Sequence, residues 1–483
     1  MTFKFLEMIN ITLVTNKAMK STPIYIRNLK LKNIRTFGEV ELKFELEDGT
    51  LPQWTIILGD NGIGKSTLLH CVAWMSPHLP YKKDQMPETF VPAPMINDEQ
   101  NELLIRLVRK KAICYKEASY LNATFQSNKQ LGDKKLAHKR DICETNIEIA
   151  LNEKGELDHV EPALTATGDT FYDNEVLIFM YSASRMLGKQ NIDVDEVSNM
   201  LPGFIQDNTI LYDAQEILHT IQYAALGADD FEKEKYQIFF NKVKEMLISL
   251  LPDFKNLSDV EITTPKLVNN KLKQGEVLIT TKHGDKIPFD DFSLGYKTVV
   301  SWSVDLSWRL FNKYPNSPNP LAEPAIVLMD EIDLHLHPIW QIEIIRSLSK
   351  HFPNCQFIAT AHSPLLVQSA LEANYAVLHF YEDTVDIINE PTDIDGWSVD
   401  QILTSEYFNI QSARGADYKK LLARRSKLIA LEKLTLKQKA ELKSVTEKLT
   451  RFPSGESPEA IEERKLIKQI ISDFKKTGQV LKV

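Results

Sequence analysis

The sequence has no long apolar run and few cysteines. No segment of its 483 residues approaches about eighteen consecutive apolar positions, and the first residues lack the basic region, apolar stretch and cleavage site of a secretory signal. The four cysteines show no CxxC spacing, which argues against a zinc site and a disulfide framework. These absences predict a soluble protein of the reducing cytoplasm, with no membrane partner.

An excess of positive charge is also missing. Lysine and arginine total 57 against 66 aspartates and glutamates, so the net charge is −9. This balance argues against wholesale electrostatic attraction to nucleic acid, although a local basic groove is compatible with it. The sequence shows no repeat of solenoid period, and its 43% apolar content is that of a folded chain. We expect two domains.

Residues 59–67 read Gly-Asp-Asn-Gly-Ile-Gly-Lys-Ser-Thr, the spacing of a phosphate-binding loop, known as Walker A. An apolar run precedes this segment and a helix-like stretch follows it. Backbone N–H groups can then surround phosphates at a helix N-terminus, while Lys65 reaches the outer phosphates and the Ser66 hydroxyl meets Mg²⁺. The pattern predicts that ATP and Mg²⁺ bind at Gly59, Asn61, Gly62, Gly64, Lys65, Ser66 and Thr67.

Residues 325–331 read Ala-Ile-Val-Leu-Met-Asp-Glu, a buried type of strand that ends in two acids. This is the pattern of a Walker B segment, in which the aspartate, here Asp330, supports the metal. Roughly 265 residues separate Lys65 from Asp330. Consecutive units of a doubly wound sheet need far fewer, so a large insertion divides the two halves of the site.

Ser293-Leu294-Gly295 lies just before a helical stretch at 298–311 and upstream of the Walker B segment. Head-to-tail ATPases carry their signature loop at this place, although this chain departs from the fuller LSGG form. A small hydroxyl and a glycine before a helix N-terminus allow close backbone contact with phosphate. We therefore expect Ser293 and Gly295 to contact the γ-phosphate of a nucleotide held by another subunit.

Hydrophobic periodicity and turn residues predict the remaining elements. We expect strands at 24–31, 39–44, 276–281 and 356–361, and helices at 213–226, 231–251 and within 417–450, with a further helix from Ser457 to near Gly478. Within 417–450, Thr435 and Gln438 have the spacing of a capping box.

Three segments together resemble the ABC-type ATPase core of the RecF, Rad50 and OLD group: residues 59–67, Met-Asp-Glu-Ile-Asp-Leu-His-Leu-His-Pro at 329–338, and Thr-Ala-His-Ser-Pro at 360–364. The resemblance covers 24–75 and 288–370. It implies that Asp330 and Ser66 hold Mg²⁺, that Glu331 polarises the attacking water, and that His362 senses or stabilises the γ-phosphate. Arg35, in the stretch 33–37, is similar to a residue of that group near the nucleotide.

The fold expected from this resemblance is α/β: a P-loop ABC-type ATPase head with an inserted, mainly helical region and a helical C-terminal appendage. We assign 1–75 to the N-terminal lobe with Walker A, 76–287 to the insertion, 288–370 to the C-terminal lobe, and 371–483 to the helical C-terminal region.

More narrowly, the compact insertion and short helical C-terminus resemble the PtuA-type ATPases of Septu and retron-associated antiphage systems, which work with an HNH nuclease of the PtuB type. The resemblance implies a regulatory ATPase that pairs with itself, acts on a partner nuclease, and meets nucleic acid through the complex.

A DNA repair or recombination ATPase of the RecF or OLD type is the alternative. The insertion lacks the sustained heptads of Rad50 arms, and the C-terminal region lacks a recognisable Toprim pattern, so we expect no intrinsic nuclease. A transporter motor is least favoured, because its Walker B would continue into a different loop.

Some assignments stay open at this point. The glutamine of the group's metal loop is Gln85, Gln100 or Gln126. His335 and His337 form an HxH pair, but they lie within the family stretch, so we do not expect a separate metal site there. The basic runs and apolar positions of the tail fit either solvated helix faces or a partner surface.

Overall fold

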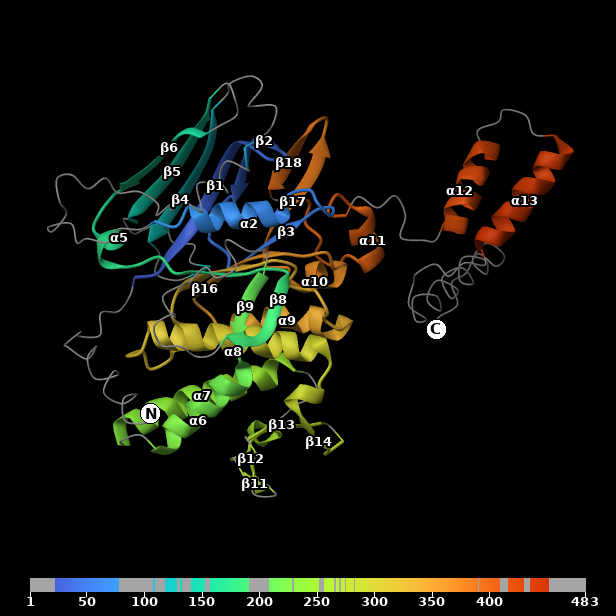
Figure 1. Cartoon of the computed structure of the whole chain (residues 1–483). Coiled ribbons are helices and arrows are strands. Elements are labelled where there is room, and N and C mark those ends of the chain that lie inside the picture. The colour runs from blue at the N-terminus through green and yellow to red at the C-terminus, as the bar shows by residue number, and fades with distance from the viewer. Residues whose placement is uncertain are drawn as a thin grey trace, which may run out of the picture. The chain divides into compact units, whose positions relative to one another are not determined.

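The computed structural model describes residues 22–77, 107–108, 118–127, 131–132, 140–152, 157–190, 208–227, 230–251, 256–264, 266–268, 271–273, 275–281, 283–389, 391–408, 416–429 and 435–450. The chain divides into two compact units, residues 1–396 and 397–483. The first unit holds a large mixed sheet with helices on it (Figure 1).

The large sheet has 11 strands within the described residues, and its order is β6-β5-β4-β1-β2-β18-β17-β3-β16-β15-β7. Their bounds are β1 Ile24–Ile34, β2 Phe37–Lys43, β3 Trp54–Leu58, β4 Ser119–Ser127, β5 Ile142–Leu151, β6 Leu157–Ala166, β7 Ile178–Tyr181, β15 Ala325–Met329, β16 Cys355–Thr360, β17 Asn374–Tyr381 and β18 Thr384–Asn389.

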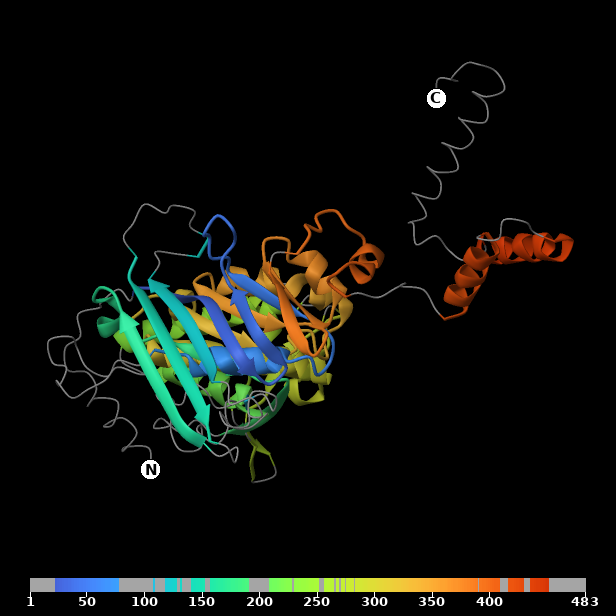
Figure 2. The same ribbon diagram turned by 90° about the horizontal axis from the view of Figure 1, so that it is seen from above.

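One part of this sheet is parallel and the other is mainly antiparallel. Strands β7, β15, β16, β3 and β17 run parallel to one another. Every residue of β3, β15 and β16 is buried, as expected of parallel strands covered on both faces. The strands β2, β1, β4, β5 and β6 pair antiparallel, and Figure 2 shows them side by side as one layer.

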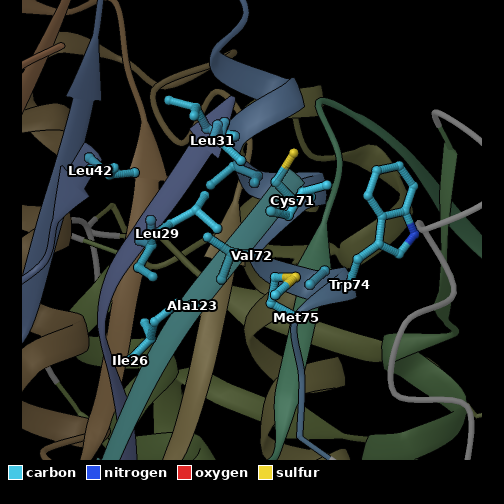
Figure 3. Close-up of a cluster of buried hydrophobic side chains, with 14 of the residues drawn as sticks. Ile26, Leu29, Leu31, Leu42, Cys71, Val72, Trp74, Met75 and Ala123 are labelled. Carbon is cyan, nitrogen blue, oxygen red and sulfur yellow. The ribbon is translucent and has the colours of Figure 1, made fainter. Parts of the chain in front are cut away.

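Helix α2, Lys65–Trp74, lies against both parts of the sheet and is buried on nearly every side. Its residue Val72 belongs to one hydrophobic cluster with Leu29 of β1, Ala123 of β4 and Ile358 of β16. Figure 3 shows Val72 beside Leu29 and Ala123. An apolar helix of this kind fixes the phosphate loop at its N-terminus to the centre of the fold.

The remaining elements of the first unit pack around this sheet. In Figure 1, α8 and α9 lie on the side of the parallel strands opposite to α2, and α6 and α7 lie beyond them. The helices are α5 Thr170–Asp173, α6 Ala214–Gly227, α7 Asp230–Leu250, α8 Leu294–Lys313, α9 Pro338–His351 and α10 Pro364–Ser369, with 3-10 turns η4 Leu257–Asp259, η5 Phe289–Asp291 and η6 Pro320–Ala322. Small sheets join β8 Ser184–Gln190 to β9 Asn208–Tyr212, β11 Lys266–Val268 to β12 Lys271–Lys273, and β10 Val260–Ile262 to β13 Val277–Thr280 and β14 Lys286–Pro288.

The second unit contains α11 Val399–Thr404, α12 Ala416–Ile429 and α13 Leu436–Thr450. Helices α12 and α13 pack together, with Leu428 and Val445 buried and an ion pair between Arg424 and Glu441 at 2.7 Å. The predicted capping box of Thr435 and Gln438 begins α13, where both Thr435 N and Gln438 N donate to the other residue's side chain. The helix expected at 457–478 lies outside the described residues.

Two predictions about secondary structure are wrong. Residues 374–389 form the hairpin β17–β18 of the large sheet rather than the start of a helical region, because an apolar β-type run pairs across a turn at Glu382. The insertion at 76–287 is mixed rather than mainly helical, since β4, β5 and β6 extend the sheet from within it. The boundaries of the predicted domains stay predictions.

None of the described helices is both long enough and apolar enough to cross a membrane.

Candidate nucleotide site

The phosphate loop, the two Walker B acids and His362 follow the carboxyl ends of parallel strands. Strand β3 leads into the phosphate loop, β15 ends before Asp330, and β16 ends at Thr360. The register pairs Met329 with Ala359 and Thr360 with Ile57. The carboxyl ends of three neighbouring strands therefore meet, which is where open α/β sheets bind ligands.

The phosphate loop depends on glycine at two close approaches. Gly64 has φ 121°, and a Cβ atom added there would lie 2.8 Å from the Phe37 ring. Gly59 has φ 146°, and its added Cβ would lie 3.0 Å from Leu378 of β17. Larger residues would be strained at both positions. Asn61 and Gly62, between them, are exposed at the surface of the loop.

Lys65 begins α2 and its side chain folds over the loop. The ammonium Nζ donates to the carbonyl oxygens of Gly59 at 2.8 Å and Asp60 at 3.0 Å. Burial lowers the pKa of Lys65, and the nearby carboxylates, Asp330 first among them, oppose that shift. A cation is thus held at the mouth of the loop, where it can reach the outer phosphates.

A chain of short hydrogen bonds joins Walker A to Walker B. The Ser66 hydroxyl donates to Asp330 Oδ2 at 2.6 Å, across 264 positions of sequence. The Thr360 hydroxyl donates to Asp330 Oδ1, also at 2.6 Å, and accepts from the backbone N–H of Glu331 at 2.7 Å. Thr360 lies in the Thr-Ala-His-Ser-Pro stretch, but no sequence pattern predicts a role for its hydroxyl.

This arrangement fits Mg²⁺. The Ser66 hydroxyl and the Asp330 carboxylate present hard oxygen ligands side by side, directly at the N-terminus of α2. Magnesium keeps several waters and binds through one or two protein oxygens together with substrate phosphates. Ser66 and Asp330 supply that number of protein ligands.

Glu331 follows Asp330 in a left-handed backbone conformation, with φ 49°. A second group at this point, Arg185, was not predicted. Its Nη2 donates to the carbonyl oxygen of Asp330 at 2.6 Å and lies 3.5 Å from that of Glu331. Burial lowers the pKa of Arg185 to about 10, while Asp330 and Glu331 act to raise it. Arg185 therefore stays cationic at neutral pH.

Arg35 lies in the turn between β1 and β2 and reaches the same helix N-terminus. Its Nη1 donates to the Thr67 hydroxyl at 3.1 Å, and its backbone N–H donates to the carbonyl of Leu107 at 2.6 Å. The structure thus brings Arg35 to the phosphate loop, and its contact with a nucleotide stays a prediction.

Ser293 and Gly295 are at the N-terminus of α8, as predicted, with Ser293 at the N-cap position. Glycine at position 295 allows the backbone of α8 to pack closely on His335, because an added Cβ would lie 2.3 Å from the carbonyl oxygen of His335. The next residue, Tyr296, contacts Trp340 edge to face at 4.1 Å between ring centroids. The turn is therefore fixed against the segment that follows Walker B, and its contact with a second subunit's nucleotide stays a prediction.

His362 follows β16 and has an exposed side chain, while its backbone N–H donates to Asp333 Oδ2 at 2.9 Å. His337 instead caps α9, where its Nδ1 accepts from Ile339 N at 3.4 Å. Within the described part of the chain, no three His, Cys, Asp or Glu side chains cluster as a separate metal site.

The metal-loop glutamine is not identified. Gln126 lies buried in β4, paired with Tyr25 of β1, whereas Gln85 and Gln100 fall outside the described residues.

Residues 168–368 match the protein family described as "AAA domain, putative AbiEii toxin, Type IV TA system". The Septu protein PtuA of Bacillus mycoides (strain KBAB4) is 25% identical over 430 residues, which are 89% of this chain and 51% of that protein. This chain therefore spans about half the length of that relative.

The "Retron Vc95 probable ATPase" of Vibrio cholerae (serotype O1 biovar El Tor) is 24% identical over 397 residues, 75% of each chain. Among solved structures, an SMC head bound to the C-winged helix domain of ScpA matches with 15% identity and a TM-score of 0.39, over 76% of this chain and 97% of that one. The sequence matches confirm the narrower resemblance, and the chain is a homologue of the Septu PtuA and retron ATPases.

Proposed function

We propose that the chain is the Mg²⁺-dependent ATPase of an antiphage defence complex. The observation that carries the ATPase assignment is the 2.6 Å hydrogen bond between Ser66 and Asp330, which unites the two Walker segments at one strand edge. Homology to the Septu PtuA and retron ATPases supports the defence role.

The residues divide the work of phosphoryl transfer. Lys65 and the N-terminus of α2 bind the phosphates, and bound Mg²⁺ would neutralise charge on the β- and γ-phosphates. The Glu331 carboxylate orients and polarises water for in-line attack, and Asp330 supports the metal together with Ser66. His362, at the end of β16, stabilises the γ-phosphate.

Two variants test this division. Glu331→Gln keeps hydrogen-bonding capacity but removes the carboxylate, so ATP should still bind while turnover falls strongly. Lys65→Ala should weaken ATP binding itself. Isothermal titration measures binding and a phosphate-release assay measures turnover. Normal hydrolysis by Glu331→Gln would show that another residue activates the water.

We propose further that two heads pair when ATP binds. Ser293 and Gly295 form a signature-like turn at the N-terminus of α8. This turn packs against His335 and not against the phosphate loop of its own chain, so we propose that it completes the nucleotide site of a second chain. Two sites would then form at one isologous interface.

Ser293→Arg should abolish ATP-dependent pairing and hydrolysis while leaving ATP binding by the isolated chain largely intact. Analytical ultracentrifugation with ATP measures pairing. Equal hydrolysis per chain by the variant and the parent at all concentrations would contradict this proposal.

A partner HNH nuclease is the third part of the proposal. Leu428 and Val445 are buried between α12 and α13, but Ile429 is 58% exposed, which leaves apolar surface for a partner. Deletion of 416–483 should abolish co-purification with a co-expressed HNH nuclease of the PtuB type, provided that the truncated chain still binds ATP. If the truncated chain still co-purifies with the nuclease, the tail is not the docking surface. If the intact chain does not co-purify with the nuclease, the partner proposal is contradicted.

A further inference from the structure

Arg185 lies next to the catalytic end of Walker B because of the sheet order. Strand β7 is the edge strand beside β15, and the register pairs Tyr181 with Met329. Residues after Tyr181 therefore pass beside the residues after Met329. This proximity places Arg185 Nη2 at 2.6 Å from the carbonyl oxygen of Asp330, although the two residues are 145 positions apart.

The group that Arg185 holds is one end of a single peptide unit. The carbonyl of Asp330 and the N–H of Glu331 belong to the same planar peptide bond. Arg185 donates to this carbonyl, and the Thr360 hydroxyl accepts from this N–H at 2.7 Å. Both ends of the peptide unit are fixed, so its rotation is prevented.

The orientation of this peptide matters because it sets the backbone of Glu331. The φ angle of Glu331 is 49°, a left-handed conformation that disfavours a side chain by roughly 1–2 kcal/mol. Such a conformation persists only when surrounding contacts hold it. A charged donor on the preceding carbonyl is a strong contact of this kind.

Arg185 is itself held in place by the strand that precedes it. The carbonyl of Tyr181 accepts from Asp330 N at 2.8 Å, and the Tyr181 hydroxyl donates to Asp305 of α8 at 2.9 Å. The Nε–H of Arg185, however, is buried without a hydrogen-bond partner among the described residues. A buried unpaired donor lowers stability, so stability alone does not account for an arginine here.

We infer that Arg185 is a positioning residue for ATP hydrolysis: it fixes the peptide between Asp330 and Glu331 and thereby aims the Glu331 carboxylate at the attacking water. This inference rests on the proposed ATPase function. Arg185 acts through Glu331 and takes no part in binding ATP.

Arg185→Met removes the donors and keeps the length of the side chain. We expect kcat to fall roughly 10²-fold, the loss that follows when a catalytic group is misplaced by about 1 Å. The Kd for ATP should change less than about threefold. Arg185→Lys, which restores one donor, should recover part of kcat. Arg27→Met is the matched control, since Arg27 of β1 pairs with Glu45, which follows β2, and it should leave kcat unchanged.

A double-mutant cycle separates positioning from a general structural role. If Arg185 acts through Glu331, adding Arg185→Met to Glu331→Gln should lower the residual rate by less than about threefold, because the two effects share one cause. Multiplication of the two losses would overturn the inference, as would a parent-like kcat for Arg185→Met. Should Arg185→Met fail to fold, Arg185→Lys decides by the same cycle.

The proposed function fails in a different way. An ATP-inactive parent would overturn the ATPase assignment and this inference together, whereas an active parent with an equally active Arg185→Met overturns the inference alone.

Discussion

The parallel and antiparallel parts of the large sheet are built for different tasks. Strands β3, β15 and β16 are buried along their whole length, and the residues that follow them carry almost all of the candidate chemistry. The antiparallel strands have one exposed polar face, where a hollow is lined by residues such as Lys30, Glu144 and Glu148. Among the described residues, they reach the phosphate loop through the turn that carries Arg35 and through Phe37 of β2, whose ring lies against Gly64.

The two parts are joined by side-chain amides as well as by the sheet. Gln356 of β16 accepts from Ile26 N at 3.0 Å and donates to Ile26 O at 2.9 Å, so it satisfies both backbone groups of one β1 residue. Asn374 of β17 likewise donates to the carbonyl of Lys43, the last residue of β2. We therefore expect that changes at the strand ends disturb catalysis, whereas changes at these side-chain amides disturb stability.

The largest effect should come from Asp330→Asn. It removes the charge that accepts from Ser66 and Thr360 and that is proposed to support Mg²⁺, while retaining the volume of the side chain. Loss of a preorganised electrostatic group lowers kcat by ~10²–10³. A phosphate-release assay at saturating Mg²⁺ and ATP measures kcat. A variant with more than about half of the parent rate would contradict the role given to Walker B.

Gln356→Leu should lower stability with little effect on the chemistry. The backbone N–H and C=O of Ile26 would be left buried and unpaired, which costs about 2–6 kcal/mol at roughly 1–3 kcal/mol for each group. Urea unfolding measures the free energy. The same change at exposed Gln237, whose side chain donates to Asn241, should cost less than about 0.5 kcal/mol. Equal losses in the two variants would refute a special role for this joint.

Thr360→Val tests whether the Thr360 hydroxyl positions Asp330 and Glu331. The isosteric change leaves Asp330 Oδ1 without its donor and Glu331 N–H without its acceptor. We expect the free energy of unfolding to fall by about 1–3 kcal/mol and kcat to fall alongside it. Thr404→Val, at an exposed position of α11, is the control. Parent-like stability and kcat together would show that the Thr360 hydroxyl does not fix Glu331.

Arg35→Ala should have the smallest effect. Arg35 is exposed and touches the site through one hydrogen bond to Thr67, so its removal should raise the Kd for ATP by about threefold to tenfold, or ~1 kcal/mol. Isothermal titration measures this change. A loss of ATP affinity as large as that of Lys65→Ala would mean that the antiparallel part of the sheet contributes strongly to phosphate binding.

The core of the site could be predicted because its chemistry constrains local sequence. A phosphate loop needs its glycines and Lys65 at fixed spacing, and a Walker B strand needs an apolar run before Asp330. These two patterns predict that Ser66 and Asp330 meet. In the structure, Ser66 Oγ lies 2.6 Å from Asp330 Oδ2.

Arg185 could not be found in this way. Its contact with Asp330 depends on β7 joining the edge of the sheet beside β15, and no local pattern in the insertion states that pairing. The hairpin β17–β18, by contrast, did carry a signal. Asn374–Tyr381 is rich in apolar and aromatic residues and is followed after a short turn by a second β-type run, which favours strands over a helix.

The central claim is that one ATP and one Mg²⁺ lie between the phosphate loop and Asp330. A structure of the Glu331→Gln variant determined with Mg²⁺ and ATP tests it most directly. We expect the β- and γ-phosphates at the N-terminus of α2, and Mg²⁺ at about 2.0–2.1 Å from the Ser66 hydroxyl with Asp330 beside it. Nucleotide bound elsewhere, or Mg²⁺ held without Ser66 and Asp330, would contradict the account.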